Sequence, residues 1–447
     1  MNRAPRVALA LVLSISAALV VAPWKGHVDD VDAQVYQVVA RNMVADGTWF
    51  DLRYLPNVWP RFREHLPFAF WPAAATMRVL GERAVDWMYA LFTLATVWVT
   101  ARIASRLAGP WSGVAAALAL GTCESFWQYG GRLLLEPPLL LFATVSAGAA
   151  LEPRPSWGRA ALFGALAMLI KGPFGLLPLA CVVVGRAVTD RSWRHVVGGA
   201  VAGIAACAPA AMFLLVDRFA RTGTWWSGYL EGRLIGWTTG SSAAGLALRW
   251  FPLRVVAGRF WPGLPAVAYG LWRARNDRGL RPVAIACVLA PVLLCVPARN
   301  WGNHTYVVFP LLAILAGAAV GPALERYLSL VGERAAIAAL AIVALATWAL
   351  SLAGVGRFVL QPPCVVSSEF AHPLAPVPPG TTVPVVSTSM EWLLIGELAA
   401  ERRVSPVLLP TLPVSGDARV AIVREGEPVR EPWRAVAAAR GWLLVRR

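Results

Sequence analysis

Ionisable residues gather in one long loop of this otherwise apolar chain, between residues 29 and 67. Valine and methionine recur there at helical spacing, which predicts a helix that lies along a membrane surface with its apolar side down. Asp32 and Tyr36 are four residues apart and therefore share a face of this helix. A carboxylate in that position could remove a proton from a hydroxyl group. A solvated loop with an interfacial helix is the alternative reading of this stretch alone.

Further polar groups lie at the ends of apolar segments, where charges are costly and are functional candidates by default. Lys171 ends one such segment and is one of only two lysines in the chain. The topology indicated by the arginines puts the candidates on one side of the membrane. There, cations could stabilise a phosphate leaving group while a carboxylate activates the attacking hydroxyl. Besides Asp32, Tyr36 and Lys171, the candidates are Arg41, Glu64, His65, Arg132, Glu136, Arg299, His304 and Tyr306.

Several candidates also have a plainer interpretation. Arg132 and Glu136 can form an i,i+4 ion pair that stabilises one helix end. Lys171 can extend its ammonium group to the interface, and His304 can be an interfacial histidine. One group of aromatic residues is more typical of a belt at the membrane surface than of a sugar-stacking site: Trp225, Trp226, Tyr229 and Trp237.

The composition excludes most soluble classes of protein. Of the 447 residues, 57% are hydrophobic and 15% are charged, which fits a polytopic membrane protein. The formal net charge of +16 comes from arginines scattered between apolar segments, so it indicates topology and anchoring and not a nucleic-acid partner. The six cysteines show no ligand spacing and predict neither a metal site nor a disulfide framework. A divalent cation as cofactor stays open.

Apolar runs of about 17 to 25 residues can span a bilayer. We expect an α-helical polytopic domain of residues 1–356 with about eleven spans, the first of which could instead be a signal peptide. The two segments around Lys171-Gly172-Pro173 both cross only if these residues form a tight reversal. The run 68–80 is expected to be re-entrant or at the surface. The expected spans are 7–23, 85–105, 112–128, 133–151, 159–171, 173–189, 196–217, 251–272, 282–298, 305–322 and 335–356.

The arginines predict the orientation of these spans. They are concentrated in alternate connections, so the positive-inside rule places the N-terminus in the cytoplasm and the loop 24–84 outside. An odd number of spans leaves residues 357–447 outside as well. In that region short alternating runs at 382–387, 404–409, 418–424 and 442–446 surround a helical stretch at 391–402, which predicts a small extracytoplasmic α/β domain.

The motifs of this chain resemble those of the bacterial relatives of the protein O-mannosyltransferases and of the lipid A aminoarabinose transferases, in the glycosyltransferase C superfamily. Two positions depart from the family pattern, because Ala33 stands in place of a glutamate and Leu66 in place of a proline. The matching stretches follow the family's order along the chain: Asp32 to Tyr36, Ala40 to Met43, Gly47 to Trp49, Glu64 to Pro67, Arg132 to Pro137, Lys171 to Pro173 and Tyr306 to Pro310.

The resemblance implies a glycosyltransferase of the bacterial plasma membrane. It implies transfer of a sugar, with inversion, from a polyprenyl-phosphate donor to a lipid, glycan or protein acceptor on the outer side, among membrane lipids. Asp32 would be the base, with Lys171, His65 and Arg132 near the donor phosphate. The alternatives are a transporter or flippase for a lipid-linked anion and a structural assembly protein. The clustering of charges at one face and the lack of an inverted repeat argue against a transporter.

Overall fold

The computed structural model of the chain describes two compact units. One comprises Met1–Pro23, Arg63–Ala69 and Asp86–Val355, and the other comprises Trp24–Phe62, Phe70–Val85 and Gly356–Arg447. The described residues are 3–21, 31–55, 59–236, 250–296, 302–352, 374, 377–378, 381–386, 398, 405–409, 419–424, 429, 432–439 and 442–446.

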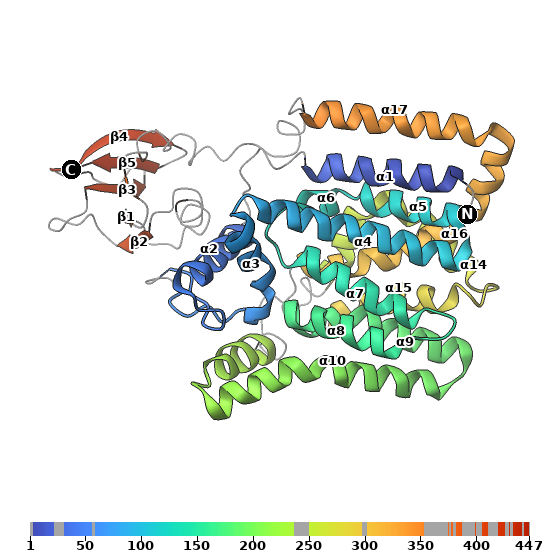
Figure 1. The fold of residues 1–447 in the computed structure, drawn as a ribbon, viewed down its shortest axis with the longest axis horizontal. Coiled ribbons are helices and arrows are strands. Elements are labelled where there is room, and N and C mark those ends of the chain that lie inside the picture. Colours follow the sequence, from blue (N-terminus) through green and yellow to red (C-terminus); the bar gives the residue numbers. More distant parts are fainter. Residues whose placement is uncertain are drawn as a thin grey trace. The chain divides into compact units, whose positions relative to one another are not determined.

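The first unit is a bundle of apolar helices (Figure 1). Its α-helices are α1 (Arg3–Val21), α4 (Ala84–Ala108), α5 (Pro110–Gly121), α6 (Glu124–Gly130), α7 (Glu136–Ala150), α8 (Trp157–Lys171), α9 (Leu177–Asp190), α10 (Trp193–Ala220), α13 (Phe251–Arg259), α14 (Leu264–Arg273), α15 (Arg281–Leu294), α16 (Phe309–Val331) and α17 (Glu333–Leu352). Short 3-10 helices are η2 (Pro67–Ala69), η3 (Gly172–Leu176), η5 (Trp261–Gly263) and η6 (Gly302–Val308), and η4 (Trp226–Ile235) is a π-helix.

Six segments of the described chain are long and apolar enough to cross a membrane: Arg3–Val20, Ala84–Ala108, Trp157–Asp190, Trp193–Ala220, His304–Val331 and Glu333–Leu350. Two of the predicted continuous spans are wrong in detail. The segment 112–128 is divided into α5 and α6 around Thr122, and 251–272 is divided by η5, where Pro262 has no backbone N–H to donate. The run 68–80 forms η2 and α3 (Trp71–Leu80).

The segment Trp157–Asp190 folds back on itself between α8 and α9. A Cβ placed on Gly164 would lie 3.1 Å from Cδ2 of Leu176, whereas twelve residues of continuous helix would separate the two by about 18 Å. Gly172 begins the turn with φ of 63°, in the left-handed region that glycine tolerates. The predicted tight reversal at Lys171-Gly172-Pro173 is therefore confirmed.

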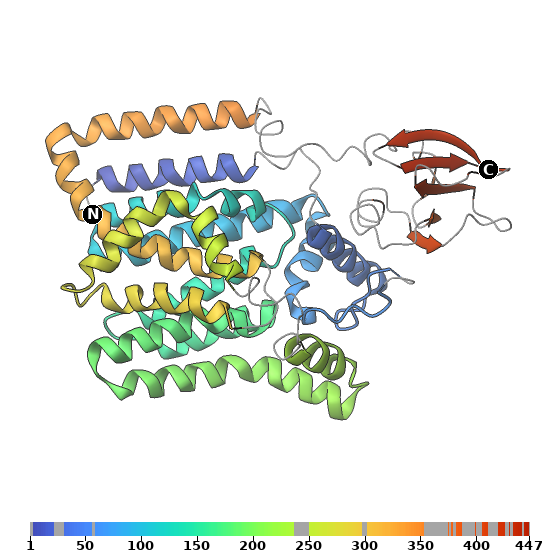
Figure 2. The same cartoon turned by 180° about the vertical axis from the view of Figure 1, so that it is seen from behind.

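Small residues bring several helices close together. A Cβ on Gly321 of α16 would lie 2.4 Å from the Cα of Ser112 in α5, so these backbones touch. Ser146 of α7 donates a hydrogen bond to the carbonyl oxygen of Ala160 in α8 at 2.7 Å. The helices α1 and α17 lie side by side (Figure 2), and Trp348 Nε1 donates to Ser14 Oγ at 2.9 Å.

In the second unit, the predicted surface helix is α2 (Val31–Asp46). Its Tyr36 is buried and packs edge-on against Phe62 and Phe70, with ring centroids 6.4 and 5.4 Å away. Arg41 forms an ion pair with Glu82, which also accepts a hydrogen bond from Gln37 at 2.8 Å. These contacts hold α2 against the segment that includes α3.

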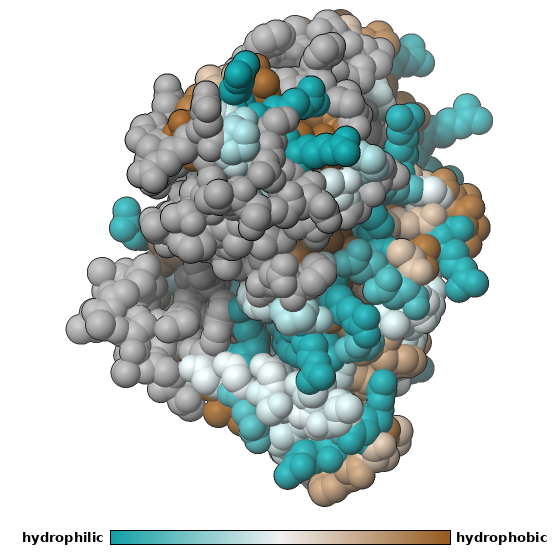
Figure 3. Space-filling model, turned by 90° about the vertical axis from the view of Figure 1, so that its left-hand side faces the viewer, coloured by the Kyte–Doolittle hydropathy of each residue, from teal (hydrophilic) through white to brown (hydrophobic). Residues whose placement is uncertain are grey.

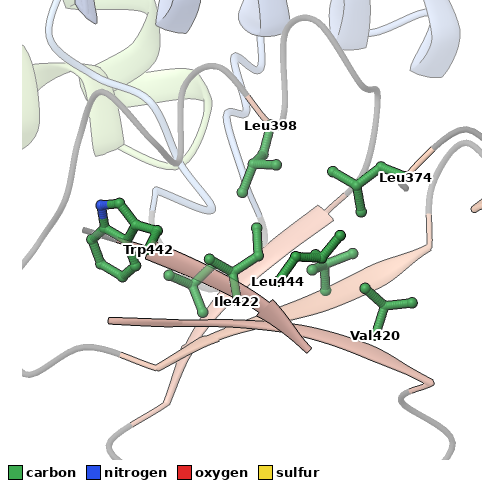
Figure 4. Close-up of a cluster of buried hydrophobic side chains, with 8 residues drawn as sticks. Leu374, Leu398, Val420, Ile422, Trp442 and Leu444 are labelled. Carbon is green, nitrogen blue, oxygen red and sulfur yellow. The ribbon is translucent and has the colours of Figure 1, made fainter. Parts of the chain in front are cut away.

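The C-terminal part of the second unit contains a five-stranded sheet of order β2-β1-β3-β5-β4. The pairs β1–β2 and β1–β3 are parallel, whereas β3–β5 and β4–β5 are antiparallel. One face is covered by a cluster that includes Ile422, Leu444 and Leu398 (Figure 4). The strands are β1 (Thr382–Val386), β2 (Ser405–Leu409), β3 (Val420–Arg424), β4 (Arg434–Ala439) and β5 (Trp442–Arg446). Four of them match predicted runs, and the predicted helix 391–402 lies outside the described residues except for Leu398.

Candidate functional site

Lys171, the last residue of α8, is the centre of a group of buried charged side chains. Its Nζ forms an ion pair with Glu136 in the first turn of α7, and the two side chains are only 6% and 4% exposed. The N-terminal end of a helix favours a carboxylate. Removing two charges from water costs several kcal/mol per ion, so a buried pair adds little to stability and is a candidate for function. The alternative interpretation was an i,i+4 ion pair between Glu136 and Arg132. In the structure, Glu136 forms its ion pair with Lys171.

A second ion pair joins the loop before η2 to the π-helix η4. Arg233 Nη1 donates to Glu64 Oε1 at 2.7 Å, with both side chains about a quarter exposed (22% and 24%). Burial raises the pKa of the Glu64 carboxyl above its ordinary value, although the charges of Arg233 and Lys171 act in the opposite direction. The influence of Lys171 on Glu64 places the two ion pairs in one neighbourhood.

Two histidines complete this neighbourhood. His65 is buried, and its pKa lies well below the ordinary value because of burial first and then the nearby charges of Arg233 and Lys171. His304 in η6 is also buried, and its ring lies against Phe174 of η3 with centroids 4.4 Å apart. The lowered pKa keeps His65 neutral at physiological pH. A neutral imidazole has one nitrogen that donates a hydrogen bond and one that accepts.

The π-helix η4 also places Tyr229 against the turn that follows Lys171. A Cβ on Gly172 would lie 2.6 Å from the Tyr229 hydroxyl, so any other residue would have to displace that hydroxyl. Burial raises the pKa of Tyr229 to about 12. π-Helices are rare and occur frequently at functional sites. Arg233 was not among the predicted site residues, and Tyr229 was predicted to belong to an aromatic belt. Their spacing of four residues was the available signal for a shared role.

Charged and apolar side chains are both exposed where α10 ends and η4 follows, and Phe219 is 80% exposed. Arg218, Arg221 and Glu231 are exposed there. In the lower part of the face shown in Figure 3, hydrophilic residues lie among pale and hydrophobic ones. Below this surface, the buried Trp225 lies under the guanidinium of Arg63 at 4.3 Å, and its backbone N–H donates to Asp217 at 2.8 Å. Trp225 is thus a core residue, and Trp237 lies outside the described residues.

Arg132 and Tyr306 both lie near the ring of Tyr129. The guanidinium of Arg132 is 6.0 Å from the ring centroid of Tyr129, and that ring is 5.5 Å from the ring of Tyr306. Arg132 is buried in the turn before α7, four residues from Glu136. Arg299 lies outside the described residues.

The remaining candidates belong to the second unit. Asp32 lies in the first turn of α2 and is partly exposed. Tyr36 is one helical turn further on, and its aromatic packing gives it a structural role. Arg41 is held by its ion pair with Glu82. In the described parts of both units, no group of three or more His, Cys, Asp or Glu side chains could hold a metal ion.

Comparisons with known proteins show a likeness of fold. Neither a scan of protein-family models nor a search of curated proteins gave a match. Among solved structures, ArnT from Cupriavidus metallidurans bound to undecaprenyl phosphate has a TM-score of 0.70 at 18% identity, over 97% of both chains. Its apo structure has a TM-score of 0.65 at 19% identity, over 97% of both chains.

A more distant neighbour is the archaeal oligosaccharyltransferase AglB from Archaeoglobus fulgidus, in complex with an inhibitory peptide and a dolichol-phosphate. The TM-score is 0.57 at 11% identity, over 94% of this chain and 69% of that one. The resemblance is confirmed at the level of fold: the chain has the fold of ArnT and AglB.

Proposed function

We propose that the protein is an integral-membrane glycosyltransferase that uses a polyprenyl-phosphate-linked sugar as donor. The observation that carries this proposal is the buried Lys171–Glu136 pair, with His65, His304 and the Glu64–Arg233 pair around it, within an ArnT-like fold. The ArnT neighbour binds undecaprenyl phosphate and the AglB neighbour binds a dolichol-phosphate. These neighbours give no support to the flippase alternative.

In this proposal, Lys171 stabilises the charge that develops on the donor phosphate. The bound donor is a phosphodiester, and the departing polyprenyl phosphate gains a further negative charge as the bond to the sugar breaks. An ammonium group in a site shielded from water stabilises such a charge far better than it would in water. Glu136 fixes the position of this ammonium group through their ion pair. Arg132 and the neutral His65 donate further hydrogen bonds to the phosphate.

Asp32 acts as the base. Its carboxylate accepts the proton of the acceptor hydroxyl while that oxygen attacks the anomeric carbon. The bond between this carbon and the phosphate oxygen breaks on the opposite side, so the configuration inverts and the electron pair leaves with polyprenyl phosphate. Each step uses only side chains of this chain. The acceptor is a lipid, glycan or protein, and the sugar is a hexose or a pentose.

We further propose that the chain crosses the bacterial plasma membrane eleven times, with a cytoplasmic N-terminus and an extracytoplasmic α/β domain at 357–447. Cys364 precedes the first strand of that domain. In a variant that keeps Cys364 alone, a membrane-impermeant maleimide should label it in intact spheroplasts. Labelling only after lysis would contradict this topology.

The function itself is tested with the purified protein in lipid nanodiscs. We expect release of polyprenyl phosphate when a panel of polyprenyl-phosphate sugars is combined with lipid A, glycan and peptide acceptors. Movement of the labelled donor between leaflets of proteoliposomes, without release of polyprenyl phosphate from any pair, would instead identify a flippase and refute the proposal.

A further inference from the structure

A cavity of about 330 Å³ lies at the other end of α7 and α8. It forms where α4, α7 and α9 end and where α15 begins, and Arg106, Glu152, Asp190 and Arg278 line it. The 15 residues of α7 separate this end from Glu136 by about 22 Å. The cavity is therefore distinct from the candidate site around Lys171.

The charges around this cavity are not balanced. Glu152 is shared by Arg106, at 2.9 Å, and by Arg159, with which it also forms an ion pair. Asp190 is shared by Arg186, at 3.2 Å, and by His195, at 2.9 Å. Arg278 on the rim has no ion-pair partner among the described residues. Three arginines thus line the cavity beside two carboxylates, Glu152 and Asp190, which leaves an excess of positive charge for an anion.

One donor inside the cavity also lacks an acceptor. Nε of Arg186 is buried and makes no hydrogen bond within the described chain, because its contact with Asp190 has unsuitable geometry. A buried donor without an acceptor is costly. A phosphate oxygen supplies such an acceptor, and arginine is the side chain that best matches phosphate geometry.

The other walls of the cavity are apolar. Ile103, Leu107 and Leu151 contribute them, beside the arginines. The cavity lies at the ends of two candidate membrane spans, Ala84–Ala108 and Trp157–Asp190, which is the depth of lipid headgroups. Basic pockets between membrane helices on the cytoplasmic side bind the headgroups of anionic lipids. A free phosphate ion would gain nothing from the apolar wall.

We propose that this cavity binds the phosphate headgroup of an anionic membrane phospholipid, with the start of its acyl chains against Leu107 and Leu151. This inference rests on the proposed membrane topology and not on the proposed catalytic activity. Such a lipid would join the ends of α4, α7, α9 and α15, which come from distant parts of the sequence.

The test uses the full-length protein in detergent micelles, titrated with phosphatidylglycerol or phosphatidylcholine and analysed by native mass spectrometry. We expect phosphatidylglycerol to be retained in preference to phosphatidylcholine. Arg278→Ala should weaken its binding about tenfold, the loss typical of a charged hydrogen bond. Arg275→Ala is the matched control, because Arg275 is exposed in the same loop and does not line the cavity.

Three results would overturn the proposal. One is equal retention of both lipids, and another is an equal loss of binding in the Arg275→Ala variant. The third is displacement of phosphatidylglycerol by millimolar inorganic phosphate, which would identify a free anion as the ligand. Arg186→Lys provides an independent check, since it keeps the charge but removes the Nε donor and should also weaken retention.

Discussion

The helix pair α7–α8 carries an ion pair at each of its ends, and the two pairs are built differently. At one end, Glu152 meets Arg159 with side chains 21% and 42% exposed. At the other end, Glu136 meets Lys171 with side chains 4% and 6% exposed. Exposed pairs are worth about 0 to 1 kcal/mol and occur throughout protein surfaces. A buried pair pays several kcal/mol in desolvation per ion.

Burial, and not the presence of an ion pair, therefore distinguishes the candidate site. Both ends use the same two helices and the same chemistry of charge. Within the part of the chain that the structure describes, the end with Lys171 also has two buried histidines beside it, His65 and His304. If activity follows this difference, loss of the buried pair should reduce it far more than loss of the exposed pair.

The largest effect is expected from the proposed base, Asp32. Asp32→Asn keeps the shape of the side chain and removes its basicity, so sugar transfer should fall by about 10² to 10⁴. Binding of undecaprenyl phosphate should stay unchanged. The exposed Asp46, on the same helix, provides the control Asp46→Asn, which should transfer sugar normally. Normal transfer by the Asp32→Asn variant would show that another residue is the base.

The second largest effect on sugar transfer is expected at Lys171, and variants at the two ends of α7–α8 can be compared directly. Lys171→Ala should slow transfer about 10²-fold and weaken binding of undecaprenyl phosphate, because a preorganised charge is lost. Lys171→Arg should recover only part of this, since a planar guanidinium does not replace a compact ammonium. Arg159→Ala at the exposed end should leave transfer unchanged. Equal losses in the Lys171→Ala and Arg159→Ala variants would remove the distinction between the ends.

A double variant separates activity from stability at the buried pair. Breaking one partner of a buried pair costs about 3 to 5 kcal/mol, but replacing both with apolar residues is often neutral. Lys171→Met combined with Glu136→Leu should therefore keep the melting temperature of the wild type and still be inactive. An active, stable double variant would show that the pair is only structural.

A smaller effect is expected at the turn after Lys171. Gly172→Ala forces a left-handed conformation on alanine, at about 1 to 2 kcal/mol, and pushes its Cβ toward the Tyr229 hydroxyl. The thermal unfolding midpoint should fall. Gly203→Ala on α10 is the control, because a Cβ there meets nothing within 4 Å. It should be neutral or slightly stabilising.

The smallest effect concerns pH and His65. Its folded pKa lies below its unfolded value, so the unfolded chain binds more protons in the interval between them, and stability falls as pH drops below about 6.5. This slope reaches at most about 1.4 kcal/mol per pH unit. His65→Asn should flatten the dependence of the melting temperature on pH between 7 and 5. An unchanged slope would mean that His65 is readily protonated in the folded protein.

Local features of this chain could be predicted from its sequence, and long-range ones could not. The helix α2 and the reversal after Lys171 depend on neighbouring residues, and the structure contains both. Arg233 was missed because its partner Glu64 is 169 residues away. The strand β4 was missed because its alanines carry little strand preference. Helix breaks such as the one at Thr122 lie inside continuous apolar runs, so hydrophobic composition alone does not predict them.

The contact between α1 and α17 has a consequence for the synthesis of the protein. Ser14 and Trp348 are 334 residues apart, so α1 leaves the ribosome long before α17, the helix against which it packs. At a synthesis rate of about 5 to 20 residues per second, α17 follows α1 after roughly 20 to 60 s. During that interval its free face must be compatible with lipid or with an insertion chaperone. The apolar surface of α1 therefore contacts lipid or a chaperone during synthesis before it packs against α17.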